Sequence, residues 1–159
     1  MTKIRITKQF TFEMAHALLG YDGLCQNIHG HSYHFDVTLI GEPIQDPASP
    51  KYGMIMDFGD LKRLVNEEVI SAYDHALLLN DQSDKILVDT LLHHFEKIVL
   101  VPFQPTTENL LADFAKRIQK KLPSDVRLFS LKLRETDSSF AELYTDDNFD
   151  PSNPADIIW

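Results

Sequence analysis

Two stretches of alternating polar and apolar residues constrain this chain most strongly. Between residues 3 and 16 the apolar side chains and His16 occupy even positions, and between residues 29 and 41 His29, His31 and the apolar side chains occupy odd positions. Neighbouring residues of a β-strand point to opposite faces, so a period of two indicates one buried and one exposed face. The sequence therefore predicts two long strands, each with histidine at one end of its buried face.

Two other segments show a helical period. From residue 57 to about residue 73 the apolar side chains recur every three or four positions, and Asp57 or Asp60 supplies the acid favoured near a helix N-terminus. A second amphipathic helix is expected after Thr106 or Thr107, because either hydroxyl can accept a hydrogen bond from the first turn.

The alternating period returns at residues 126–136 and 139–145, which predicts a third and a fourth strand. Residues 80–105 have no clear period and could hold a short helix followed by an extended stretch. The order strand, strand, helix, helix, strand, strand indicates an α+β fold, with a four-stranded antiparallel sheet and two helices on one face. The length of 159 residues fits one domain. Two unpaired sheet edges favour association with further subunits.

Charge and composition exclude several classes of partner. The net charge is −9, and the tightest basic group has the spacing of a solvated helix side, so no nucleic acid is expected (Lys116, Arg117, Lys120 and Lys121). No apolar run approaches the roughly 18–20 residues needed to cross a bilayer, so no membrane association is expected. The chain has one cysteine, which cannot form an intrachain disulfide, and a reduced, cytoplasmic setting is expected.

The histidines carry the strongest functional signal. Residues two apart on a strand point the same way, roughly 6–7 Å apart, so His29 and His31 can share a metal ion. If the two long strands pair, His16 can join them. Three histidines with one open position are typical of a catalytic zinc, although manganese and iron also accept such ligands. A lone histidine would indicate only a polar strand end, and His34, on the opposite parity, is expected to face away.

Cys25 lies four residues before His29, in the loop that leads into the second strand. Most free cysteines behave as small buried hydrophobic residues. Near a dication and imidazole rings, however, a thiol favours its thiolate form. Cys25 is therefore either a reactive thiolate or a fourth ligand that closes a structural metal site.

Three further side chains are candidates for catalysis. Asp74 and His75 follow the first helix, and an adjacent acid and histidine can form a proton relay, although such a pair can also simply mark a helix end. Glu135 shares the apolar parity of Phe129, Leu131 and Leu133, so a carboxylate is expected on the buried face. It needs a partner there, either a structural salt bridge or a nitrogen heterocycle that offers two adjacent N–H donors.

These residues stand in motifs that resemble those of a known family. From about Phe10 to Tyr144, the motifs resemble those of the 6-pyruvoyltetrahydropterin synthase / 6-carboxytetrahydropterin synthase family (FTFEMAH, CxxxHGHSY, GMIMDFGDLK, DHALLLN, PTTENLL and RETDSSFAELY). Relative to that family, residues 1–159 are expected to form a single domain with an insertion at about 81–104 and a C-terminal extension at 146–159.

The resemblance implies a fold, an assembly and a set of roles. The fold is the tunnelling fold (T-fold), in which three subunits close a barrel and two trimers stack into a homo-hexamer, with active sites between subunits. One zinc ion per chain is implied on His16, His29 and His31. Cys25 becomes the general base, and Asp74 and His75 form its proton relay. Glu135 anchors the pterin ring, helped by Thr106 and Thr107.

The implied substrate is 7,8-dihydroneopterin triphosphate. Three residues separate Cys25 from His29, a short spacing that resembles the carboxy-forming branch. That branch makes 6-carboxy-5,6,7,8-tetrahydropterin, acetaldehyde and triphosphate on the route to queuosine and other 7-deazapurines. The alternatives are the pyruvoyl branch of tetrahydrobiopterin synthesis, a zinc-stabilised protein that binds pterins or purines without catalysis, and a zinc hydrolase acting on another heterocycle.

Overall fold

The fold is built around a hairpin of two thirteen-residue strands, β1 (Ile4–His16) and β2 (His29–Gly41). They pair antiparallel along their whole length, from Ile4 opposite Gly41 to His16 opposite His29. The computed structural model describes residues 2–148. Both predicted strands are confirmed almost to the residue, because each has a long apolar face that a slip of one position would expose to water.

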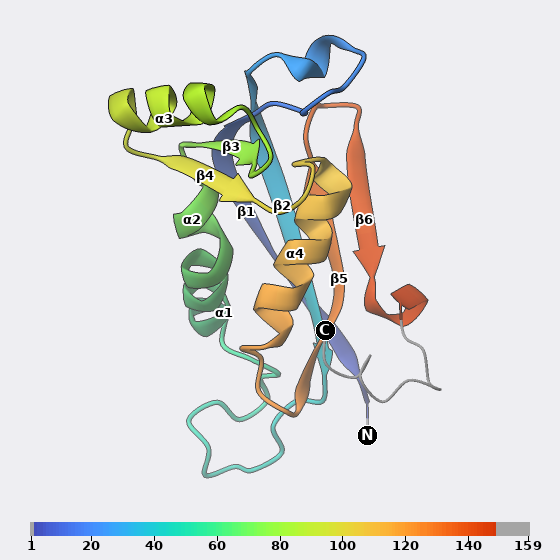
Figure 1. Ribbon diagram of the computed structural model, residues 1–159. Coiled ribbons are helices and arrows are strands. Elements are labelled where there is room, and N and C mark those ends of the chain that lie inside the picture. The colour runs from blue at the N-terminus through green and yellow to red at the C-terminus, as the bar shows by residue number, and fades with distance from the viewer. Residues whose placement is uncertain (1, 149–159) are drawn as a thin grey trace.

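The sheet has six strands, in the order β4-β3-β1-β2-β5-β6 (Figure 1). The third and fourth strands of the prediction are β5 (Val126–Arg134) and β6 (Phe140–Tyr144), which pair antiparallel beyond β2. The four-stranded, wholly antiparallel sheet was wrong, because β3 (Ala76–Asn80) and β4 (Ile98–Val101) add two parallel strands beside β1. Both are short apolar runs with too few residues to show a period of two.

The segment between β3 and β4 holds the short helix α3 (Lys85–His94). Its N-terminus is capped by Asp84, whose side chain accepts a hydrogen bond from the backbone N–H of Leu87 at 2.9 Å. The expectation of a short helix followed by an extended stretch is therefore confirmed. The prediction of two helices was incomplete, because α3 is a further helix.

The helices that cover the sheet begin where the caps predicted. Asp57 accepts hydrogen bonds from the first turn of α1 (Phe58–Val65), and Thr106 does so for α4 (Thr107–Gln119). The first predicted helix continues to Tyr73, but in three parts, with a π-helical turn η2 (Asn66–Ile70) between α1 and α2 (Ser71–Tyr73).

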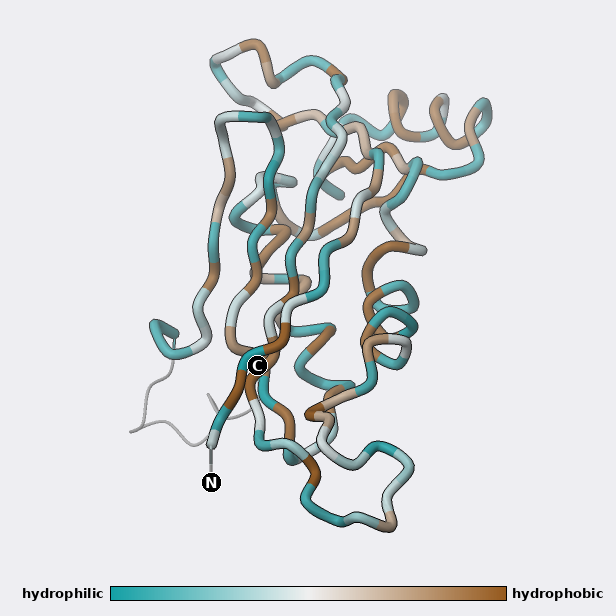
Figure 2. The backbone as a smooth tube through the Cα atoms, turned by 180° about the vertical axis from the view of Figure 1, so that it is seen from behind, coloured by the Kyte–Doolittle hydropathy of each residue, from teal (hydrophilic) through white to brown (hydrophobic). Residues whose placement is uncertain are grey.

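The core lies between these helices and one face of the sheet. Phe114 of α4 is fully buried, and its ring lies 5.3 Å from Phe35 and 5.1 Å from Tyr73, centroid to centroid. Burying a ring of this size contributes about 1.5–3 kcal/mol to stability. Seen from behind in Figure 2, the strands lie in front of the helices, and cross-strand polar pairs such as Thr7–Thr38 occupy this uncovered face. His34 lies on it, exposed, as its parity predicts.

The prediction that Phe129 lies on the buried face of β5 was wrong. Phe129 was expected beside Leu131 and Leu133, but the register of β5 shifts opposite Thr38 and Leu39. A β-bulge of this kind inserts one residue and reverses the faces on one side of it. Phe129 therefore packs under the guanidinium of Arg5, at 3.8 Å from the ring centroid, outside the core.

In the part of the chain that the structure describes, no helix is both long enough and apolar enough to cross a membrane. The expected extension at 146–159 begins in a 3-10 turn, η3 (Thr145–Asn148), and the rest of it lies outside the described residues.

Candidate metal centre and active site

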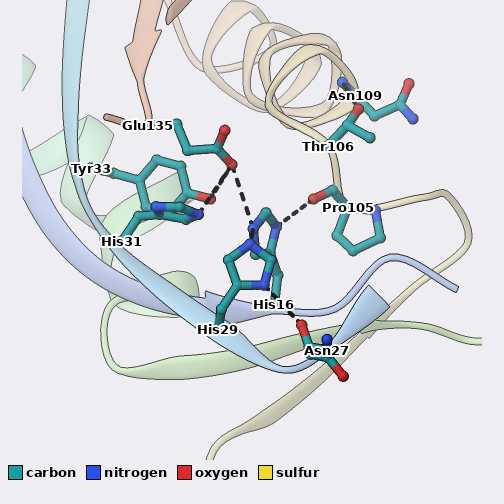
Figure 3. A network of polar contacts seen from close by, with 9 residues as sticks. All are labelled: His16, Asn27, His29, His31, Tyr33, Pro105, Thr106, Asn109 and Glu135. Carbon is teal, nitrogen blue, oxygen red and sulfur yellow. Dashed lines mark hydrogen bonds and ion pairs between the residues drawn. The ribbon is translucent and has the colours of Figure 1, made fainter. Parts of the chain in front are cut away.

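The candidate site lies at one end of the sheet, where β1 and β5 end and where β2 and α4 begin (Figure 1). His16, His29 and His31 come together there, with their ligand nitrogens all within 4.8 Å of one another. His16 is the last residue of β1 and faces His29, the first residue of β2. The strand pairing that buries the core therefore also gathers the three imidazole rings, as the sequence predicted (Figure 3).

Backbone carbonyls fix two of the rings. Nδ1 of His16 lies 2.7 Å from the carbonyl oxygen of Pro105, and Nδ1 of His29 lies 2.8 Å from that of Asn27. A carbonyl can only accept, so each Nδ1 carries the proton and donates it. In the neutral rings both Nε2 atoms are then unprotonated, although they face each other at 3.1 Å. Two lone pairs at this distance repel unless a cation lies between them.

Within residues 2–148, the third ring, that of His31, also has an unpartnered nitrogen. Nε2 of His31 is buried and, among the described residues, has no hydrogen-bond partner. Burial lowers the pKa of both His16 and His31, which favours the neutral form that binds metals. Three imidazoles with converging ligand nitrogens, two of them oriented by backbone carbonyls, fit a divalent cation.

Glu135 borders the same space. Its Oε1 lies 3.4 Å from Nε2 of His16 and 3.6 Å from Nε2 of His31, and it accepts a hydrogen bond from the Tyr33 hydroxyl at 3.3 Å (Figure 3). Burial raises the pKa of Tyr33, so this hydroxyl stays protonated and remains a donor. The prediction of a carboxylate on the buried face is confirmed, and Tyr33 is a partner that the sequence reasoning did not assign.

Cys25 lies in the 3-10 turn η1 (Leu24–Gln26) and is half-buried. In residues 2–148 the group of side chains close enough to share a metal ion consists of the three histidines and does not include its sulfur. The role of Cys25 stays a prediction.

Asp74 and His75 form a contact, but not at this site. Oδ1 of Asp74 accepts hydrogen bonds from the backbone N–H of Glu13 and from Nδ1 of His75, both at 3.0 Å. The bond from Glu13 is the main cause that lowers the pKa of Asp74. His75 has a φ of +61°, a conformation rare outside glycine and one that re-aims the side chain.

The His75 side chain is 76% exposed and lines a hollow of about 320 Å³ with outward-facing residues of β1 and β2 such as Ala15 and Gly30. Within residues 2–148, no hydrogen bond or ion pair joins Asp74 or His75 to Cys25 or to the three histidines. A single chain therefore does not assemble the relay that the sequence analysis expected.

The loop before α4 supplies contacts that the sequence reasoning missed. Thr106 is half-buried and caps the helix, and Thr107 is buried behind it. Pro105 holds His16 through its carbonyl, and the Asn109 side chain donates to the carbonyl of Gln104 at 2.9 Å. Pro105 and Asn109 stand in the PTTENLL motif, which was the available signal.

The fold is α+β, and its histidine cluster is a candidate metal site. A sequence model described as 6-pyruvoyl tetrahydropterin synthase matches residues 5–146. The chain is 36% identical over 140 residues to the 6-carboxy-5,6,7,8-tetrahydropterin synthase of Haemophilus influenzae, an alignment that covers 87% of this chain and 96% of the relative.

Solved structures agree with these matches. The 6-pyruvoyl tetrahydropterin synthase of Caenorhabditis elegans superposes with a TM-score of 0.64 and 25% identity, covering 91% of this chain and 96% of that one. An uncharacterised protein from Wolinella succinogenes shares the fold, with a TM-score of 0.71 and 20% identity over 91% and 99% of the two chains. The chain belongs to the 6-pyruvoyl tetrahydropterin synthase family. Within it, the sequence similarity supports the carboxy-forming branch.

Two histidines on the same strand provide a matched test of the metal centre. We expect His31→Ala to lose zinc, because it removes one of three converging nitrogens, and His34→Ala to retain about one zinc ion per chain, because its ring lies on the opposite face. Metal analysis after dialysis against buffer without added metal measures both. Equal zinc contents in the two variants would contradict the assignment.

Proposed function

We propose that this chain is a zinc-dependent 6-carboxy-5,6,7,8-tetrahydropterin synthase, a lyase that converts 7,8-dihydroneopterin triphosphate to 6-carboxytetrahydropterin, acetaldehyde and triphosphate. The observation that carries the proposal is the convergence of ligand nitrogens of His16, His29 and His31 within 4.8 Å of one another, with Cys25 four residues before His29. Family membership and the similarity to a named carboxy-forming relative support the reaction. The product's place on the route to queuosine is part of the proposal.

The three histidines would hold the zinc ion, which when bound would act as a Lewis acid on the side-chain oxygens of the substrate. The thiolate of Cys25, in the adjoining loop, would take up a proton from a carbon of the substrate side chain. The reduced cytoplasm, which we propose as its location, would keep this thiol free.

Glu135 is suited to anchor the pterin ring. All polar contacts of its carboxylate with residues 2–148 involve Oε1, which leaves Oε2 available to a ligand. The bond from Tyr33 orients the carboxylate, and a carboxylate can accept two parallel N–H donors from a heterocycle. Thr106 and Thr107, at the start of α4, would border the same ring.

The relay of Asp74 and His75 would act on a neighbouring subunit. The His75 side chain lies against the uncovered face of the sheet, and β4 and β6 form the two edges of the sheet in residues 2–148. A second copy that covers this region would bring its own Cys25 to the relay. We therefore propose a homo-hexamer, a dimer of trimers, with each active site shared between two subunits.

Product analysis tests the proposed reaction. Incubation of the zinc-loaded protein with dihydroneopterin triphosphate is expected to release acetaldehyde and triphosphate in equal amounts, measured by derivatisation and by ion chromatography. Triphosphate without acetaldehyde would overturn the carboxy-forming assignment and favour the pyruvoyl branch. Release of neither would contradict catalysis on this substrate.

A mixing experiment tests the shared site. Cys25→Ala and His75→Ala are each expected to lose turnover while retaining about one zinc ion per chain, since neither residue is a ligand. After the two variants are unfolded together and refolded as a mixture, about a quarter of the sites in a closed ring would combine an intact Cys25 with an intact His75. Activity near that fraction is expected. An inactive mixture that has assembled normally would contradict a site shared between subunits.

A further inference from the structure

Gln104 pairs with a distant piece of backbone at two points. Its Oε1 accepts a hydrogen bond from the N–H of Leu19 at 3.0 Å, and its Nε2 donates to the carbonyl oxygen of Leu19 at 2.8 Å. The side-chain amide thus pairs with a backbone unit 85 residues away, as a strand residue pairs with its neighbour. Both bonds are short enough to be well formed.

The backbone that Gln104 holds belongs to the loop of Cys25. Leu18, next to Leu19, donates its N–H to the carbonyl oxygen of Cys25 at 2.9 Å, which ties the two sides of the loop together. The other hydrogen bonds within the loop each span only three residues and join Tyr21 to Leu18, Gln26 to Gly23 and Asn27 to Leu24. Its side chains are exposed or half-buried, and Leu24 is 87% exposed. Loops with few buried contacts open readily unless hydrogen bonds restrain them.

Gln104 is itself held rigidly. Its carbonyl oxygen accepts hydrogen bonds from the side chain of Asn109 at 2.9 Å and from the N–H of Thr106 at 2.7 Å. The next residue, Pro105, accepts the hydrogen bond from Nδ1 of His16. Two consecutive residues therefore hold the two parts of the site. Pro105 accepts a hydrogen bond from the candidate metal ligand His16, and Gln104 binds the backbone of the Cys25 loop.

We propose that Gln104 is a positioning residue that keeps the Cys25 loop in register with the histidine cluster. This inference rests on the proposed function, because it assigns Gln104 a role through Cys25. It predicts a specific kinetic effect. Loss of the amide would leave the histidines in place and the substrate bound, but it would spread Cys25 over several positions, and misplacement of a reacting group lowers the rate of the chemical step.

Gln104→Met tests the proposal, because methionine keeps the length of the side chain and removes both hydrogen bonds. Gln82→Met is the matched control, since Gln82 lies in another surface loop and bonds locally to Asp81. In the zinc-loaded protein we expect Gln104→Met to lower kcat by about tenfold or more, with KM within about twofold of wild type. Hydrogen exchange at the Leu18 and Leu19 amides, followed by mass spectrometry, is expected to accelerate by about tenfold.

The zinc content of Gln104→Met is expected to stay at that of wild type, and Gln82→Met is expected to match wild type in every measurement. Unchanged kcat and unchanged exchange in Gln104→Met would overturn the proposal, and so would loss of zinc, which would place the effect on the metal centre. Cys25→Ala, assayed alongside, distinguishes failure of the proposed function from failure of the role of Gln104. If it retains turnover, the proposed function fails, whereas an inactive Cys25→Ala beside a fully active Gln104→Met rejects the role of Gln104 alone.

Discussion

The pairing register of β1 and β2 is the constraint on which the rest of the structure depends. It places His16 opposite His29 at the last step of a ladder that begins with Ile4 opposite Gly41. Because side chains alternate between the faces of a strand, a slip of one residue would turn every core side chain to the other face. Burial of the aromatic core therefore fixes the strand register, and this register places the imidazole rings beside one another.

The groups around the histidine cluster determine the tautomer and the protonation of its rings. The carbonyls of Pro105 and Asn27 select the tautomer of two rings, and burial keeps the pKa of His16 below its ordinary value. Groups beyond the ligands commonly orient a metal site in this way. Here the start of α4 performs that task, because Pro105, whose carbonyl holds His16, directly precedes Thr106, the residue that caps the helix.

Much of this could be predicted from the sequence, since long segments with a clean period report directly which face is buried. The two long strands and the histidine cluster followed from period and spacing, and residue type narrowed the caps to Asp57 or Asp60 and to Thr106 or Thr107. The strands β3 and β4 did not, because a short apolar run looks the same in a helix and in a buried strand. Phe129 was misplaced because a β-bulge leaves no mark in the pattern, and its position depends on the neighbouring strand.

The catalytic relay shows a different limit. Asp74 and His75 were candidates for a proton relay, but local spacing says nothing about the face of the sheet toward which a turn points. The left-handed backbone at His75 and the hydrogen bonds of the pair with Glu13 direct the imidazole to the uncovered face. The contact of Gln104 with Leu19 was also beyond reach, because it joins segments 85 residues apart in the chain.

X-ray absorption at the zinc edge of the loaded, substrate-free protein tests the central claim most directly, since it counts the nitrogen and sulfur neighbours of the metal. Three imidazole nitrogens, at about 2.0–2.1 Å, and a further light atom in the remaining position are expected. A sulfur neighbour at about 2.3 Å, or fewer than three imidazoles, would contradict an open three-histidine site.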